Sequence, residues 1–140
     1  MPAILENILY TGKTRTTGGR DGQGRSSDGE LDVRLSKPGL GRPGSNPEQL
    51  LGVGWSACFI GALHRAGQSF AIRLPEDVTV AADISLGTAV DGGFALAARL
   101  TVELPGLAAE DKARLVEAAH QLCPYSKATR GNIEVTFDIP

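Results

Sequence analysis

Apolar and polar residues alternate along several parts of the chain in the pattern of half-buried β-strands. The clearest example lies near the end, where Ile133, Val135 and Phe137 would face inward while Glu134 and Thr136 face outward. The same pattern, together with an abundance of residues that favour strands, predicts five strands in all. They are expected at residues 6–17, 30–36, 78–86, 94–104 and 132–139, with a hairpin turn at 91–93.

A long helix should follow the second strand. Asn46 is a good N-cap, Pro47 suits the first helical position, and Gln49 can complete a capping box. From Leu50 to Ala66 the stretch is apolar almost all round, which predicts a buried central helix.

Glycines inside this helix bear on how it packs. Gly52, Gly54 and Gly61 each weaken a helix by about 1 kcal/mol relative to alanine. We therefore expect another backbone to approach the helix closely.

A second helix is expected at residues 107–123, where it is amphipathic and is stopped by Pro124. The glycine-rich stretches at 18–29 and 37–45 are expected to be loops. Strand pairs segregated from helices, without a regular alternation of the two, indicate an α+β fold. The length of 140 residues fits a single domain that spans residues 1–140.

Composition narrows the classes of function. Apolar residues at 41% and charged residues at 21% are values of a globular protein. A formal net charge of -2 leaves no electrostatic footprint for nucleic acid, and no cluster of lysine and arginine marks a membrane surface. The chain has no apolar run long enough to span a bilayer and no secretory signal at its start. We expect a cytoplasmic protein.

Two motifs suggest a nucleotide site but lack its other features. TGKT at 11–14 is similar to the end of a phosphate-binding loop, but that loop needs a glycine where this chain has Asn7. GGRDGQG at 18–24 lacks the spacing of a dinucleotide fingerprint and is followed by a strand. We expect no nucleotide cofactor.

The two cysteines and two histidines could in principle complete a zinc site. Cys58 and His64 would lie on roughly opposite faces of their helix. His120 and Cys123 could meet, but two ligands do not hold a structural zinc. We therefore expect no metal.

Cys58 and Cys123 are the only cysteines in the chain. Both lie on apolar helical faces, so each could be a small core residue. In a cytoplasmic protein, however, a cysteine pair is more often catalytic, redox-active or metal-binding than a structural disulfide. The two are far apart in the sequence and form no CxxC motif, so shared chemistry requires the fold to join them. The residues alone leave both interpretations open.

Three segments of the chain resemble one protein family. They are YTGKTRTTGGRDGQGRSSDGELDVRL at 10–35, SNPEQLLGVGWSACFIGAL at 45–63 and LCPYSKATRGNIEV at 122–135. In this order they resemble the organic hydroperoxide resistance (Ohr) proteins of the OsmC-like superfamily. Two departures concern Trp55, which stands where the family commonly has tyrosine, and the loop at 37–45, which looks short.

The resemblance implies a fold, an activity and a set of site residues. The fold would be an Ohr/OsmC-like α+β domain with antiparallel sheets packed around the central helix, in an intertwined homodimer. The activity would be reduction of organic hydroperoxides, such as alkyl or fatty-acid hydroperoxides, to alcohols. By position, Cys58 would be the peroxidatic thiol and Cys123 the resolving thiol, and Arg20 and Glu48 would assist. No cofactor would be bound, and dihydrolipoamide or a lipoylated protein would be the reductant.

The chemistry of the residues agrees with these implied roles. A thiolate attacks peroxide, and an ordinary cysteine is only a few per cent ionised at neutral pH. Cys58 lies too far along its helix for the helix dipole to help, so the guanidinium of Arg20 is the obvious candidate to stabilise the anion. Glu48 begins the same helix about 15 Å from Cys58. A Glu48 that orients Arg20 there requires either a distorted helix or a glutamate from a neighbouring chain, and we expect the second.

Two alternatives stay open on the sequence. One is a peroxidase of the sister OsmC branch with a different peroxide preference. The other is a non-catalytic dimeric ligand-binding stress protein whose cysteines are merely buried.

Overall fold

The computed structural model describes residues 2–140, which form two compact units, Met1–Pro47 and Glu48–Pro140. We call them the N-terminal and the C-terminal unit and describe each by itself. The prediction of a single domain over residues 1–140 stays a prediction.

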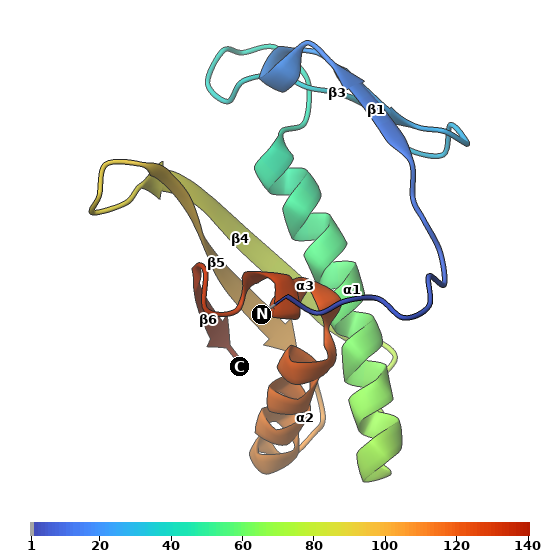
Figure 1. Ribbon diagram of the computed structural model, residues 1–140. Coiled ribbons are helices and arrows are strands. Elements are labelled where there is room, and N and C mark those ends of the chain that lie inside the picture. The colour runs from blue at the N-terminus through green and yellow to red at the C-terminus, as the bar shows by residue number, and fades with distance from the viewer. Residues whose placement is uncertain (1) are drawn as a thin grey trace. The chain divides into compact units, whose positions relative to one another are not determined.

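The N-terminal unit is built on a small antiparallel sheet with the strand order β1-β2-β3 (Figure 1). Its strands are β1 (Thr14–Thr17), β2 (Gln23–Ser26) and β3 (Asp32–Arg34), and the one-turn helix η1 (Gly19–Asp21) links the first two.

Two predictions for this unit are wrong in part. The strand expected at 6–17 is limited to Thr14–Thr17, and the loop expected at 18–29 contains β2. β2 is rich in glycine and serine, which disfavour strands, but it lies between β1 and β3 and pairs with both. Pairing on two sides overrides the weak preference of its residues.

The C-terminal unit contains three strands and three helices. Its helices are α1 (Pro47–Phe70), α2 (Ala109–Leu122) and α3 (Pro124–Thr129), with α1 beginning one residue before the unit. Its strands are β4 (Thr79–Thr88), β5 (Phe94–Glu103) and β6 (Glu134–Asp138), in the order β4-β5-β6. The predicted hairpin at 91–93 and the start of α1 at Pro47 are confirmed.

This sheet is mixed rather than antiparallel. β4 and β5 are antiparallel, but β6 runs parallel to β5. The expectation of antiparallel sheets is therefore wrong for this pair. α2 and α3 intervene between the two strands, and a connection of that length allows the chain to return in the same direction.

Pro124 has a second role that the sequence analysis missed. It ends α2, as expected, but it also occupies the first turn of α3. Proline is tolerated there because the first N–H groups of a helix have no intrahelical partner. Cys123 lies at the joint with an extended backbone, so it belongs to neither helix.

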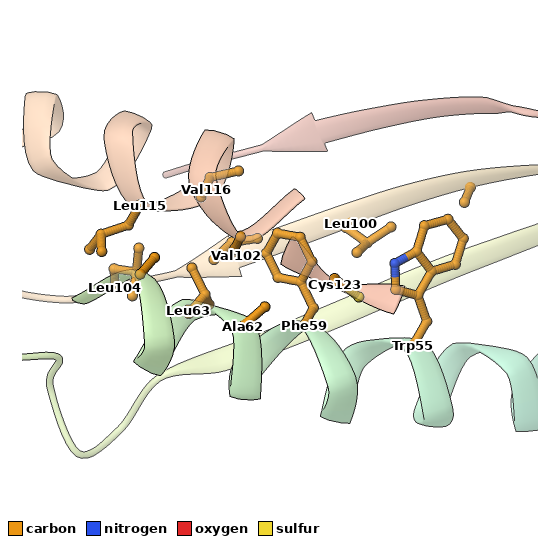
Figure 2. Packing of buried hydrophobic residues seen from close by; sticks show 13 residues of the cluster. Trp55, Phe59, Ala62, Leu63, Leu100, Val102, Leu104, Leu115, Val116 and Cys123 are labelled. Carbon is orange, nitrogen blue, oxygen red and sulfur yellow. The ribbon is translucent and has the colours of Figure 1, made fainter. Parts of the chain in front are cut away.

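A single hydrophobic core fills the C-terminal unit. Figure 2 shows Trp55, Phe59 and Leu63 of α1 pointing toward side chains of β5 and of the segment 115–123. The fully buried large side chains of this core are Trp55, Phe59, Leu63, Leu100, Val102, Leu104, Leu115 and Cys123. The inward residues predicted for the last strand pack against this core from β6 and its flanks.

α1 buries one side only, so the prediction of a helix buried all round is wrong for the single chain. Val53 is 71% exposed, and Ala57 and Gly61 are exposed as well. The sheet and α2 cover the opposite side, which carries Trp55 and Phe59. An apolar face therefore stays open to solvent on α1.

Close approach to the helical glycines is confirmed at one of the three positions. A side chain at Gly52 would lie 3.5 Å from the backbone oxygen of Ala82 in β4. Gly54 instead faces the ring of Tyr125, whose hydroxyl would lie 3.1 Å from an added Cβ. Gly61 has nothing within 4 Å, so that glycine needs another explanation.

Within residues 2–140, no helix combines the length and the apolar character that crossing a membrane requires.

Candidate active site

The fold brings the two cysteines together. Cys58 lies on α1 and Cys123 lies at the joint between α2 and α3, and their Sγ atoms are 3.4 Å apart. Both are free thiols, and the Cys123 thiol donates a hydrogen bond to Cys58 Sγ. A disulfide needs its sulfurs about 2.05 Å apart, so a small local movement is enough to close one.

The two thiols differ in their access to solvent. Cys58 is half-buried, whereas Cys123 is fully buried among the core residues. Cys58 is therefore the more accessible of the two residues.

Burial raises the pKa of the Cys58 thiol, because a thiolate loses hydration in this position. The backbone N–H of Tyr125 acts against this rise by donating a hydrogen bond to the sulfur, while the neighbouring Cys123 adds to it. Within these contacts the protonated form of Cys58 is favoured.

The Tyr125 N–H is a site group that the sequence analysis missed. Tyr125 follows Pro124 in the first turn of α3, where backbone N–H groups point outward from the helix start. Proline just inside a helix start was the available signal, since Pro124 could have been taken as a beginning as well as an end.

Two further contacts hold the start of α3 on α1. Trp55 donates a hydrogen bond from its indole N–H to Ser126 Oγ at 3.3 Å, and both side chains are fully buried. The ring of Tyr125 lies over Gly54, where there is no side chain to displace it. The cysteine pair is thus flanked by contacts between the same two segments.

Arg20 lies in the N-terminal unit, within η1. Gly22 ends this turn, and a Cβ at Gly22 would lie only 1.8 Å from the backbone oxygen of Thr17, so no other residue fits. Arg42 pairs with Asp21, the neighbour of Arg20, at 2.8 Å. The sequence GGRDG therefore builds a tight turn that presents Arg20.

Glu48 lies in the first turn of α1, as predicted. Arg20 belongs to one unit, while Glu48 and both cysteines belong to the other. The predicted contacts of Arg20 with Glu48 and with the thiol of Cys58 stay predictions.

His120 lies one turn before Cys123 and packs edge-on against the ring of Phe137, with ring centroids 4.9 Å apart. Burial lowers the pKa of His120, and the nearby charge of Arg130 lowers it further. Across residues 2–140, no group of three or more histidine, cysteine or acidic side chains is placed to hold a metal ion.

Comparisons with known proteins identify the family of this chain. The family model for OsmC-like proteins matches residues 38–138. The organic hydroperoxide resistance protein of Xanthomonas axonopodis pv. citri is 43% identical over 141 residues, which cover 98% of this chain and 99% of that protein. The chain belongs to the organic hydroperoxide resistance (Ohr) family within the OsmC-like proteins.

Other Ohr proteins extend the likeness from sequence to structure. The Ohr protein OhrB of Bacillus subtilis is 39% identical over 134 residues, which cover 94% of this chain and 98% of that protein. The crystal structure of OhrB superposes with a TM-score of 0.89 over 95% of this chain and 100% of that chain. The predicted α+β fold of the Ohr family is confirmed.

Proposed function

We propose that this protein is a cysteine-based peroxidase that reduces organic hydroperoxides to alcohols. The observation that carries the proposal is the 3.4 Å separation of Cys58 and Cys123, which lie in different segments of an Ohr-family fold. Two thiols at this distance can exchange between the dithiol and the disulfide with little movement. A pair of merely structural cysteines has no need of such proximity.

The unequal burial of the two thiols supports the assignment of their roles. Cys58 is the more accessible, so its thiolate attacks an oxygen of the hydroperoxide. The O–O bond breaks, an alcohol leaves, and Cys58 becomes a sulfenic acid. Cys123, buried beside it, then condenses with the sulfenic acid to form a disulfide and water.

Arg20 is proposed to stabilise the Cys58 thiolate and the bound peroxide, with Glu48 orienting the guanidinium. The need for a cation follows from the surroundings of Cys58, which raise its pKa. The tight turn at 18–22 supports the role of Arg20, because a fixed turn presents a side chain at low entropic cost.

A dithiol must reduce the disulfide to complete the cycle. We propose a lipoyl dithiol, either dihydrolipoamide or a lipoylated protein, on the basis of the family. No bound cofactor takes part in the proposed reaction, and the cytoplasmic location stays a prediction.

We propose an intertwined homodimer in which the partner supplies Glu48 to each site. Exposed apolar side chains support an interface. On α1 the open face includes Val53, and near the start of the chain the exposed apolar residues are Ile4, Leu5, Ile8, Leu9 and Tyr10. Apolar surface of this kind is typical of regions that a second chain covers.

The apolar residues next to Cys58 on α1 differ in whether a substrate from solution can meet them. Trp55 and Phe59 are fully buried in the core, so they do not meet a substrate from solution. Ile60 is half-buried and remains a candidate. Each apolar carbon of a substrate that is buried contributes about 0.8 kcal/mol, which favours an alkyl or fatty-acid hydroperoxide over hydrogen peroxide.

Replacement of each cysteine tests the proposed roles. Cys58→Ser should abolish reduction of cumene hydroperoxide, whereas Cys123→Ser should reduce one equivalent and then stall as a sulfenic or overoxidised form. The wild-type chain should lose two thiols per equivalent of peroxide in a thiol titration. Unchanged thiols would instead favour a non-catalytic binding protein, and faster turnover of hydrogen peroxide than of cumene hydroperoxide would favour the sister branch.

A further inference from the structure

The segments that carry the cysteines share a second contact, one helical turn from the sulfurs. Trp55 lies one turn before Cys58 on α1, and Ser126 lies three residues after Cys123 in α3. The Trp55 indole N–H donates a hydrogen bond to Ser126 Oγ, and the Cys123 thiol donates one to Cys58 Sγ. The Trp55–Ser126 bond and the cysteine pair are therefore neighbouring links between the same two segments.

The Trp55–Ser126 bond is sealed from water, because both side chains are fully buried. A buried donor or acceptor that loses its partner cannot turn to solvent, so breaking this bond is costly. Cys123 lies at the joint between α2 and α3, with φ -66° and ψ 122°, where its N–H donates to the Ala119 carbonyl and its carbonyl accepts from the Lys127 N–H. Those backbone bonds stay within α2 and α3, whereas the Trp55–Ser126 bond joins the start of α3 to α1.

We propose that Trp55 is a positioning residue for the step in which Cys123 resolves the sulfenic acid. Its bond to Ser126 holds the start of α3 on α1 while the Cys58 side chain changes its chemical state. This inference rests on the proposed function.

The resolving step makes the positioning matter. The sulfur of Cys123 attacks the sulfur of the Cys58 sulfenic acid, an S–S bond forms and the S–O bond breaks. Hydroxide leaves and takes the proton of the Cys123 thiol as water, so no further oxidant or reductant is needed. A second hydroperoxide competes for the same sulfenic acid and converts it to a sulfinic acid. The partition between the two products measures how well Cys123 is held in place.

The test compares variants that keep the fold and remove the bond. Trp55→Phe and Ser126→Ala should each slow disulfide formation by about three- to tenfold, the range expected for one buried hydrogen bond. The yield of sulfinic acid at Cys58, measured by mass spectrometry, should rise with peroxide concentration more steeply than in the wild type. The rate of the first step, followed as alcohol release, should stay unchanged.

Three controls separate positioning from loss of stability. Trp55→Tyr keeps a hydrogen-bond donor and differs from Trp55→Phe by one hydroxyl. Its disulfide should therefore form faster than that of Trp55→Phe. The double variant should resolve no more slowly than the slower single variant, because both changes remove one bond. Val102→Ala removes core packing in β5 without touching the Trp55–Ser126 bond. This variant should give the same ratio of disulfide to sulfinic acid as the wild type.

Diamide provides a readout that does not depend on peroxide chemistry. It oxidises the dithiol directly, and Trp55, as the only tryptophan, reports closure of the disulfide by its fluorescence. Slower closure in Trp55→Phe, followed by gel shift, and in Ser126→Ala would support the inference even if hydroperoxide were not the substrate. Wild-type closure rates and wild-type sulfinic yields in both variants would overturn it. A wild-type chain that closes normally with diamide but ignores hydroperoxide would overturn the proposed function and, with it, the role of Trp55 in peroxide resolution.

Discussion

The surroundings of Cys58 disfavour the form of the residue that the proposed chemistry needs. Burial raises the pKa of its thiol, and the N–H of Tyr125 offsets only part of that effect. A reactive thiolate at neutral pH therefore requires a cation in addition. Arg20, presented by a turn that tolerates only glycine at position 22, is the residue proposed to supply it.

Removal of this cation should shift the pH dependence of the first step. The rate rises with pH as the thiolate forms, so a higher pKa of Cys58 moves the midpoint of the profile upward. Arg20→Ala should therefore reduce kcat/KM at pH 7 by about tenfold for each unit that the pKa rises, and a high pH should restore it. The kcat/KM of Arg20→Lys at pH 7 should lie between that of the wild type and that of Arg20→Ala.

The matched control is Arg25→Ala on β2, an exposed arginine of the same unit that pairs with Asp32 at 3.4 Å. Its pH profile should match the wild type. If the pH profile of Arg20→Ala also matched the wild type, Arg20 would not stabilise the Cys58 thiolate.

The residues of the site could be predicted from the sequence only where a side chain carries the motif. Cys58 and Cys123 could be picked out because thiols are rare and the segments around them resemble one family. The N–H of Tyr125 could not, since every residue but proline has this group and only the path of the backbone selects one.

Helices and strands could be predicted where they depend on residues close in sequence, but not where they depend on distant partners. The hairpin of β4 and β5 and the start of α1 depend on residues close in sequence, and both could be predicted. β2 and the parallel pairing of β6 depend on partners far along the chain, so the local pattern did not reveal them. α1 also continues past its expected end at Ala66 to Phe70, where the chain turns at Ala71 with a φ of 56°.

The end of α1 allows a prediction about stability. A Cβ at Gly67 would lie 2.7 Å from the backbone oxygen of Ile72, whereas one at Gly52 would lie 3.5 Å from the nearest backbone oxygen. Gly67→Ala should therefore destabilise the fold by about 1–3 kcal/mol. Gly52→Ala, the same change in the same helix, should be neutral or stabilising by up to about 1 kcal/mol. Chemical denaturation measures both free energies of unfolding, and equal effects would show that close approach does not govern these positions.

At the scale of the whole molecule, the open apolar face of α1 is difficult to explain in a single chain. A helix that packs on one side normally carries polar residues on the other. α1 instead exposes Val53, Ala57 and Gly61 there. Small residues such as Ala57 and Gly61 let a second helix approach closely, so this face suits the two-fold interface of the proposed homodimer.

A charge placed on this face should separate the chains. Val53→Glu should convert the proposed dimer to a monomer in analytical ultracentrifugation, because burying an unpaired carboxylate at an interface costs several kcal/mol. The fold should survive, since Val53 is 71% exposed within one chain. Val90→Glu is the matched control, because Val90 is fully exposed near the tip of the β4–β5 hairpin, and this variant should stay dimeric.

If the partner's Glu48 orients Arg20, the Val53→Glu monomer should also lose peroxidase activity while its cysteine pair still closes with diamide. A wild-type monomer with full activity would contradict both the interface and the proposed origin of Glu48.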